Sequence, residues 1–201
     1  MRKWLGFFMA VVLLVTALMI LPIHGEAELY DNVIRLHVLA DSDDETDQAL
    51  KLVVRDAVLE ETRPLLKNVS DRAQAERILR AAIPALEATA NDALAAAGSA
   101  DRATVTLGQE TYPTREYEQL AFPAGEYLSL RVMIGEAAGR NWWCVLFPPL
   151  CLSAATEERE TETLCLSAGL TGEQYRMIAD TDSTKYKLRF KILEVAESLF
   201  D

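Results

Sequence analysis

Carboxylates crowd one short stretch of the chain, directly after the first alternating apolar run. Asp41, Asp43 and Asp47 stand there at alternating positions, and His37 lies four residues before the first of them. An EF-hand calcium loop needs glycine at its sixth position and glutamate at its twelfth, but counting from Asp41 those positions hold threonine and leucine. We therefore expect these carboxylates to stabilise the start of a helix, and we expect His37 to be an exposed or hydrogen-bonded side chain. An acid/base role for Asp41, Asp43 or His37 is the alternative.

The rest of the sequence lacks the motifs of common catalytic and cofactor sites. No serine stands in a Gly-x-Ser-x-Gly setting, both histidines fall within the first 40 residues, and no cysteines have CxxC spacing. Neither a Walker loop nor a dinucleotide fingerprint occurs. We expect no catalytic residue, no metal, no cofactor and no small-molecule substrate.

Three cysteines allow one disulfide. Cys144 and Cys151 are close in sequence and would pair in an oxidising compartment, which leaves Cys165 as a buried thiol. The alternative is three buried thiols that pack as small apolar groups.

The N-terminus has the pattern of an export segment. Arg2 and Lys3 precede a low-polarity run over residues 4–23, which is long enough either for a signal peptide or for a membrane anchor. A small-x-small site favours cleavage after Ala27, so we assign residues 1–27 to this segment and residues 28–201 to one exported domain. Membrane contact is then expected only through residues 4–23.

Charge narrows the choice of partners. The chain has 201 residues and a net charge of −11, and without residues 1–27 the net charge is −12. Such acidity argues against nucleic acid and against anionic lipid as partners, because both need a basic surface.

Periodicity predicts an α+β domain with a mixed or antiparallel sheet and packed helices. Residues 32–40 alternate as a half-buried strand that places Arg35 and His37 on its polar side, and a helix follows from the acidic run and ends before Pro64. A second helix is expected to begin at the Asp71 cap, to bend or break at Pro84 and to end before Gly98.

The second half of the chain changes to strand patterns. Residues 104–108, 127–134 and 142–147 are expected strands, the last covered on both faces, with a hairpin connection or an irregular strand over 112–125. Residues 153–163 have weak helical character, and an apolar stripe through Tyr186, Phe190 and Leu193 indicates a C-terminal helix.

One block stands out for its aromatic, proline and cysteine content. It contains Tyr112-Pro-Thr-Arg-Glu-Tyr117, Phe122-Pro-Ala-Gly-Glu-Tyr127 and Gly139-Arg-Asn-Trp-Trp-Cys-Val-Leu-Phe-Pro-Pro-Leu-Cys151. This array closely resembles the stage II sporulation protein R family, and the resemblance extends over about residues 30–200.

The resemblance implies a signalling function. Members of that family are exported from the forespore of endospore-forming bacteria into the space between the septal membranes. There they activate a membrane-embedded, aspartic-type peptidase of the mother cell, which processes the precursor of sporulation sigma factor E. The protein would therefore be an activator and not itself a peptidase; an exported cell-envelope hydrolase or a septal scaffold is the alternative.

An activator needs a surface for its peptidase, and aromatic residues and arginine dominate interface energetics. The tyrosines, the arginine, the glutamate and the prolines of this block are expected in loops and are the better surface candidates, whereas the two tryptophans are expected in the core first and at the interface second. The full set is Tyr112, Arg115, Glu116, Tyr117, Trp142, Trp143, Pro148 and Pro149.

Overall fold

The computed structural model describes residues 4, 6, 29–117, 120–151 and 158–179. Apart from residues 4 and 6, the expected export segment lies outside these residues, as do the cleavage site and the C-terminal helix. Among the described residues, no helix is both long and apolar enough to cross a membrane. The elements in chain order are β1 (Ile34–Leu39), α3 (Glu45–Leu66), α4 (Arg72–Ala96), β2 (Ala103–Tyr112), β3 (Arg115–Glu116), β4 (Ala121–Phe122), β5 (Gly125–Ile134), β6 (Asn141–Phe147), α5 (Glu158–Ser167) and α6 (Gly172–Ala179).

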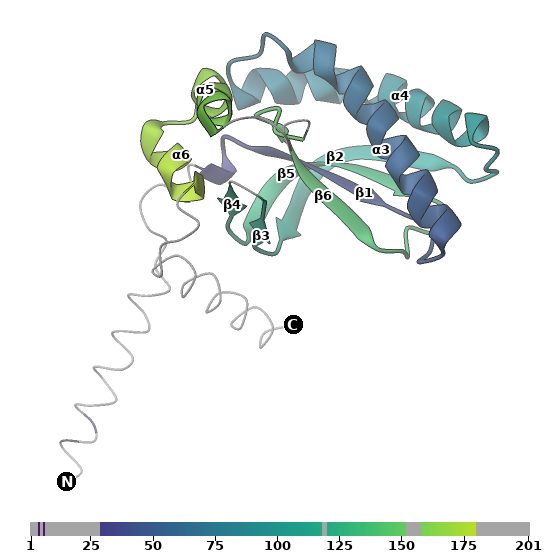
Figure 1. Cartoon of the computed structure of the whole chain (residues 1–201), viewed down its shortest axis with the longest axis horizontal. Coiled ribbons are helices and arrows are strands. Elements are labelled where there is room, and N and C mark those ends of the chain that lie inside the picture. The colour runs from purple at the N-terminus through teal and green to yellow at the C-terminus, as the bar shows by residue number, and fades with distance from the viewer. Residues whose placement is uncertain (1–3, 5, 7–28, 118–119, 152–157, 180–201) are drawn as a thin grey trace.

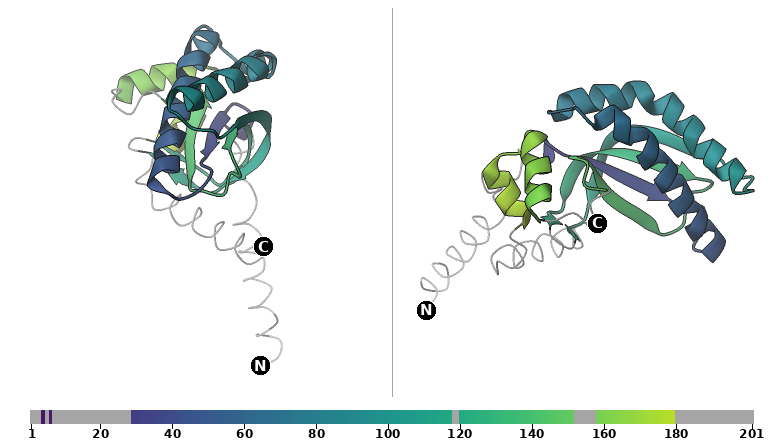
Figure 2. Two further views of the ribbon diagram at one scale, coloured as in Figure 1. Left: turned by 90° about the vertical axis from the view of Figure 1, so that its right-hand side faces the viewer. Right: turned by 45° about the horizontal axis from the view of Figure 1, so that its top comes forward.

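The fold is α+β, with a four-stranded mixed sheet in the order β2-β5-β1-β6. β1 runs parallel to β5 and antiparallel to β6, and β2 runs antiparallel to β5. The two long helices α3 and α4 lie on one side of the sheet (Figures 1 and 2). Side chains that alternate toward them, such as Leu36, Leu130 and Val132, form the main apolar core.

β1 is more deeply buried than expected. The half-buried strand predicted from the sequence is a central strand, and all six of its residues are buried. Arg35 and His37, expected on a polar side, are 0% and 5% exposed. The prediction of an exposed side for this strand is wrong, because its polar residues are also covered.

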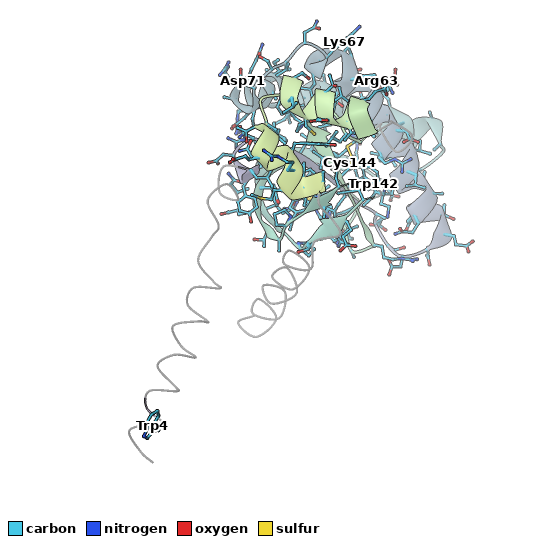
Figure 3. The ribbon with its side chains drawn as sticks, turned by 60° about the vertical axis from the view of Figure 1, so that its left-hand side comes forward. Trp4, Arg63, Lys67, Asp71, Trp142 and Cys144 are labelled. Carbon is cyan, nitrogen blue, oxygen red and sulfur yellow. A yellow bond between two sulfur atoms is a disulfide. The ribbon has the colours of Figure 1, made fainter. Side chains whose placement is uncertain are left out.

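The helix ends follow the predicted signals in part. The Asp71 side chain caps α4 by accepting a hydrogen bond from the Gln74 amide at 2.8 Å, and Gly98 takes the positive φ of 79° just past the helix end. The expected end of the first helix before Pro64 is wrong, because α3 continues through this residue to Leu66. α4 is continuous through Pro84, so the helix does not break there. Pro64 lies in the last turn of α3, so the backbone hydrogen bond that proline cannot donate is one of the last in the helix. Figure 3 shows Arg63, Lys67 and Asp71 together around the turn between these helices.

Two carboxylates of the acidic run serve a different role from the expected helix stabilisation, whereas Asp47 lies in the first turn of α3 as expected. β5 and β6 flank β1, so residues 135–140 cross the carboxyl end of β1. The Asp41 carboxylate accepts the Glu136 amide at 2.6 Å, and the Asp43 carboxylate accepts the Arg140 amide at 2.7 Å. The N-cap residue of α3, Asp44, makes no side-chain cap hydrogen bond. The two carboxylates therefore hold a crossing turn.

A disulfide joins β6 to the segment that follows it. Cys144 and Cys151 are bonded, with their Cα atoms 5.5 Å apart, and Cys165 is a buried free thiol. Burial raises the pKa of the Cys165 thiol to about 12, so this group stays protonated at neutral pH.

The expected connection over 112–125 is a small β3–β4 hairpin. The short helix α6 was not predicted from the sequence.

Candidate functional site on the second face of the sheet

The face of the sheet opposite α3 and α4, called the second face below, gathers polar and aromatic side chains from all four strands. Strand alternation and register place them there, because residues two apart on a strand share a face and paired residues on neighbouring strands do too. The set is Arg35, His37, Glu110, Tyr112, Ser129, Arg131 and Trp143.

Arg35 is the most deeply buried member of this set. Four aromatic rings surround its guanidinium, with centroids 4.6 to 5.9 Å away. Its Nε donates to the Cys144 carbonyl at 3.2 Å and its Nη2 donates to the Tyr117 hydroxyl at 2.9 Å. Because a buried cation is costly unless it is compensated, these rings and oxygens must supply the stabilisation that water would otherwise provide. The rings belong to Tyr112, Tyr117, Phe122 and Tyr127.

This arrangement fastens the connection between β2 and β5 to the centre of the sheet. Tyr117 and Phe122 come from that connection, whereas Arg35 comes from the middle of β1. Arg35 therefore decides where the loop around Tyr117 lies.

Glu110 lies beside this cage of four aromatic rings around Arg35 and contacts both His37 and Arg131. Its Oε1 lies 2.8 Å from Nδ1 of His37 and 3.3 Å from Nε of Arg131. Burial by itself would raise the pKa of Glu110, but hydrogen bonds with His37 and Ser129, together with the charges of His37 and Arg131, outweigh it and leave the pKa below its ordinary value. Glu110 is therefore ionised at neutral pH.

Tyr112 completes the buried part of the second face. Its hydroxyl lies 2.7 Å from Oγ of Ser129, and both residues are fully buried. Burial is the main reason that the pKa of Tyr112 is well above its ordinary value. The expected loop position of Tyr112 is wrong, because the residue ends β2 and is inaccessible to a partner.

The exposed rim of the second face combines Arg115 with Trp143. The Arg115 guanidinium lies 3.6 Å from the centroid of the Trp143 ring, and both side chains are half-buried. Glu116 is exposed beside Arg115, and Tyr117 is half-buried with its hydroxyl 3.5 Å from the Trp143 carbonyl. The structure thus brings together four of the interface candidates: Arg115, Glu116, Tyr117 and Trp143.

The remaining candidates lie elsewhere. Trp142 is half-buried and points to the helix side, where the Arg55 guanidinium is 4.8 Å from its ring centroid. Trp142 lies two residues before the disulfide-bonded Cys144 on β6 (Figure 3). Pro148 is buried, contrary to its expected surface position, and Pro149 lines a small apolar pocket with residues of α3. The predicted strand covered on both faces is an edge strand, and its faces are both covered only from Cys144 onward.

The described side chains form no recognisable catalytic constellation around His37. Its Nε2 atom is buried and has no hydrogen-bond partner, so no hydroxyl or thiol of the described chain is placed for activation by it. The described residues also hold no group of three or more histidine, cysteine or acidic side chains that could bind a metal ion. The alternative acids, Asp41 and Asp43, bind the crossing turn.

Sequence reasoning missed the centre of the cluster, which is formed by Arg35, Glu110, Ser129 and Arg131. The available signal was the presence of arginine and histidine in an otherwise apolar strand. Such residues indicate solvent exposure when the strand is at an edge, and a buried polar network when it is central.

The fold and this cluster define a disulfide-bonded, two-layer α+β domain with a buried polar network on the face of the sheet opposite the two long helices. The family model described as stage II sporulation protein R matches residues 30–157 of the chain. The chain belongs to this family.

A curated relative supports the same assignment. Stage II sporulation protein R of Bacillus subtilis (strain 168) is 39% identical over 121 residues, which cover 60% of this chain and 54% of the relative. The match therefore spans about half the length of that relative. Both comparisons name a sporulation protein, and neither names an enzyme. No solved structure matches the chain.

Proposed function

We propose that the protein is a secreted signal from forespore to mother cell that activates a membrane-embedded aspartic-type peptidase. The peptidase would then process the precursor of sporulation sigma factor E. Membership of the stage II sporulation protein R family is the single observation that carries this proposal. The export pattern of residues 4–23 supports it, because the protein must leave the compartment in which it is made.

The rim of the second face is the proposed contact with the peptidase. Arg115 and Trp143 stack on each other and remain partly accessible, next to the exposed carboxylate of Glu116. Arginine and tryptophan contribute disproportionately to binding energy when a partner covers them. Behind the rim, the Arg35 cage holds the loop in place, so little order has to be gained on binding.

Activation requires the signal to bind the active arrangement of the peptidase more tightly than its resting arrangement. A tenfold shift in the population of the active form needs about 1.4 kcal/mol of differential affinity. A few side chains on the rim suffice for an effect of this size.

Reconstitution tests the proposal. The full chain, the peptidase and the sigma-factor precursor are combined in one membrane preparation, and conversion of the precursor is followed on gels. We expect conversion only when this protein is present. Conversion that is equally fast without it would contradict the activating function.

A matched pair of variants tests the contact surface. Arg115→Ala and Arg55→Ala each remove an arginine that covers a tryptophan, but on opposite faces of the sheet. We expect Arg115→Ala to raise the protein concentration for half-maximal conversion about tenfold, and Arg55→Ala to leave it unchanged. Equal effects of both variants would remove the second face as the contact.

A further inference from the structure

The second face and its rim concentrate positive charge. Among the described residues there, three arginines stand against two glutamates, with His37 as a further potential cation. The domain of residues 28–201 as a whole carries −12. This face therefore differs in the sign of its charge from the domain to which it belongs. The five charged groups are Arg35, Glu110, Arg115, Glu116 and Arg131.

Arg35 has no carboxylate partner within the described part of the chain. Its hydrogen bonds go to the Cys144 carbonyl and the Tyr117 hydroxyl, and its other printed neighbours are aromatic rings. Its Nη1 is buried and has no hydrogen-bond partner among these residues. Rings and neutral oxygens stabilise a cation but do not cancel its charge. Because little water screens a buried charge, its field extends to the surface of this face.

Glu110 neutralises only part of the positive charge. Its Oε1 lies between Nδ1 of His37 and Nε of Arg131, at 2.8 and 3.3 Å, so one carboxylate serves both groups. The Arg131 side chain is 37% exposed, and the ion pair with Glu110 is the only one that it makes among the described residues. A guanidinium has five N–H donors, and this contact uses the nitrogen nearest the chain. Arg131 therefore keeps donors for a partner.

Arg131 and Arg115 lie on either side of His37. The strand register pairs His37 with Arg131 on β5 and with Trp143 on β6, and the Arg115 guanidinium covers the Trp143 ring at 3.6 Å. Neighbouring strands are about 4.8 Å apart, so the two arginines are separated by about 10 Å across the face. Three residues of an extended chain, at about 3.3 Å each, span the same distance.

We propose that the second face binds an acidic, extended segment of the protein partner, with one carboxylate on Arg131 and a second on Arg115. The proposal rests on the proposed function, in which that partner is the peptidase. A narrow acidic segment can approach this one face, whereas a broad anionic membrane surface would also meet the negative charge of the rest of the domain. Arg131 thereby joins the contact surface, and charge determines which face of the domain the partner meets.

The reconstituted conversion of the sigma-factor precursor, with the full chain, tests this contact. Arg131→Gln removes one positive charge from the second face. Its matched control is Arg77→Gln, which removes an exposed arginine from α4, on the other side of the sheet, and changes the net charge equally. We expect Arg131→Gln to raise the protein concentration for half-maximal conversion about fivefold, the effect of one partly screened charge pair. The control should behave as the parent.

Two further variants separate charge from structure. Arg131→Lys keeps the positive charge and should retain the parent concentration for half-maximal conversion within about twofold. Glu116→Gln removes an exposed carboxylate next to Arg115 and should lower that concentration, because less negative charge then faces the acidic segment. Denaturant titrations of the Arg131 variants show whether the fold is intact. A lysine variant as weak as the glutamine variant, in a folded protein, would overturn the proposal.

The remaining outcomes are distinct from one another. Conversion that is equally fast without the parent protein would remove the proposed function and this contact with it. Conversion that needs the protein but responds equally to Arg131→Gln and Arg77→Gln would overturn the acidic contact alone. Vesicles of phosphatidylglycerol without the peptidase probe a lipid headgroup as the occupant. Sedimentation of the parent with these vesicles that Arg131→Gln reduces would also overturn the proposal.

Discussion

The two faces of the sheet are built from the same strands but are stabilised by different interactions. Toward α3 and α4, side chains such as Leu36 and Leu130 make apolar contacts that have little directional preference. On the second face, Arg35, His37 and Ser129 are buried just as deeply but must satisfy hydrogen bonds and charge. The first face therefore contributes most of the stability, and the second face determines where particular loops lie.

The adjacent tryptophans show the difference on a small scale. Trp142 and Trp143 are both half-buried and each is covered by an arginine, yet strand alternation sends them to opposite faces. Arg55 comes from a helix of the main core, whereas Arg115 comes from the β3–β4 hairpin. The same pair of residue types thus supports packing on one face and forms an accessible rim on the other.

The largest loss of stability should come from removing a side chain from the helix-covered face. Leu130→Ala removes a fully buried side chain from the central part of β5 and should lower the free energy of unfolding by about 2–5 kcal/mol. Its neighbour Ser129→Ala, on the second face, should cost about 1–3 kcal/mol, because it leaves the Tyr112 hydroxyl without its partner. Denaturant titrations of both variants check the comparison, which fails if the serine change is the more damaging one.

An intermediate effect is expected for Arg35→Met, which replaces the caged guanidinium with an apolar chain. The loss of its bonds to Tyr117 and to the Cys144 carbonyl should cost about 1–3 kcal/mol. The larger consequence should be local: amides of residues 114–117 should exchange faster than in the parent, whereas those of α4 should not. An unchanged loop would show that Arg35 does not position it.

The smallest effect should be a pH dependence that originates at Glu110. Its pKa is lower in the folded protein than its ordinary value of 4.5, so its stabilising contribution is complete above that value and is lost as the pH falls through the folded pKa. We expect the parent to be more stable than Glu110→Gln at pH 6 to 7, with the difference shrinking below about pH 4.5. Unfolding curves at several pH values measure this, and a difference that grows in acid would contradict the ion-pair assignment.

Local signals in the sequence anticipated the α+β class, the Asp71 cap and the strands β2, β5 and β6, because these depend on neighbouring residues. They failed for the helix end expected before Pro64 and for a break at Pro84, since helix packing against the sheet outweighed the cost of the prolines. They also failed for Tyr112, which is buried because β2 continues past residues 104–108, where the alternating pattern predicted the strand. The sequence indicated which residues are interface candidates, but it did not indicate on which face of the sheet each of them lies.

The sequence by itself determined the family, through the tyrosine, proline and tryptophan block, and the order of strands and helices. It also identified Cys144 and Cys151 as the pair that could bond, because a short separation keeps both ends close. Only the tertiary structure shows that β1 is a central strand. For this reason Arg35 and His37 belong to a buried polar network and not to the surface. The physical reason is that periodicity records which residues share a face, whereas burial of that face depends on segments far away in the chain.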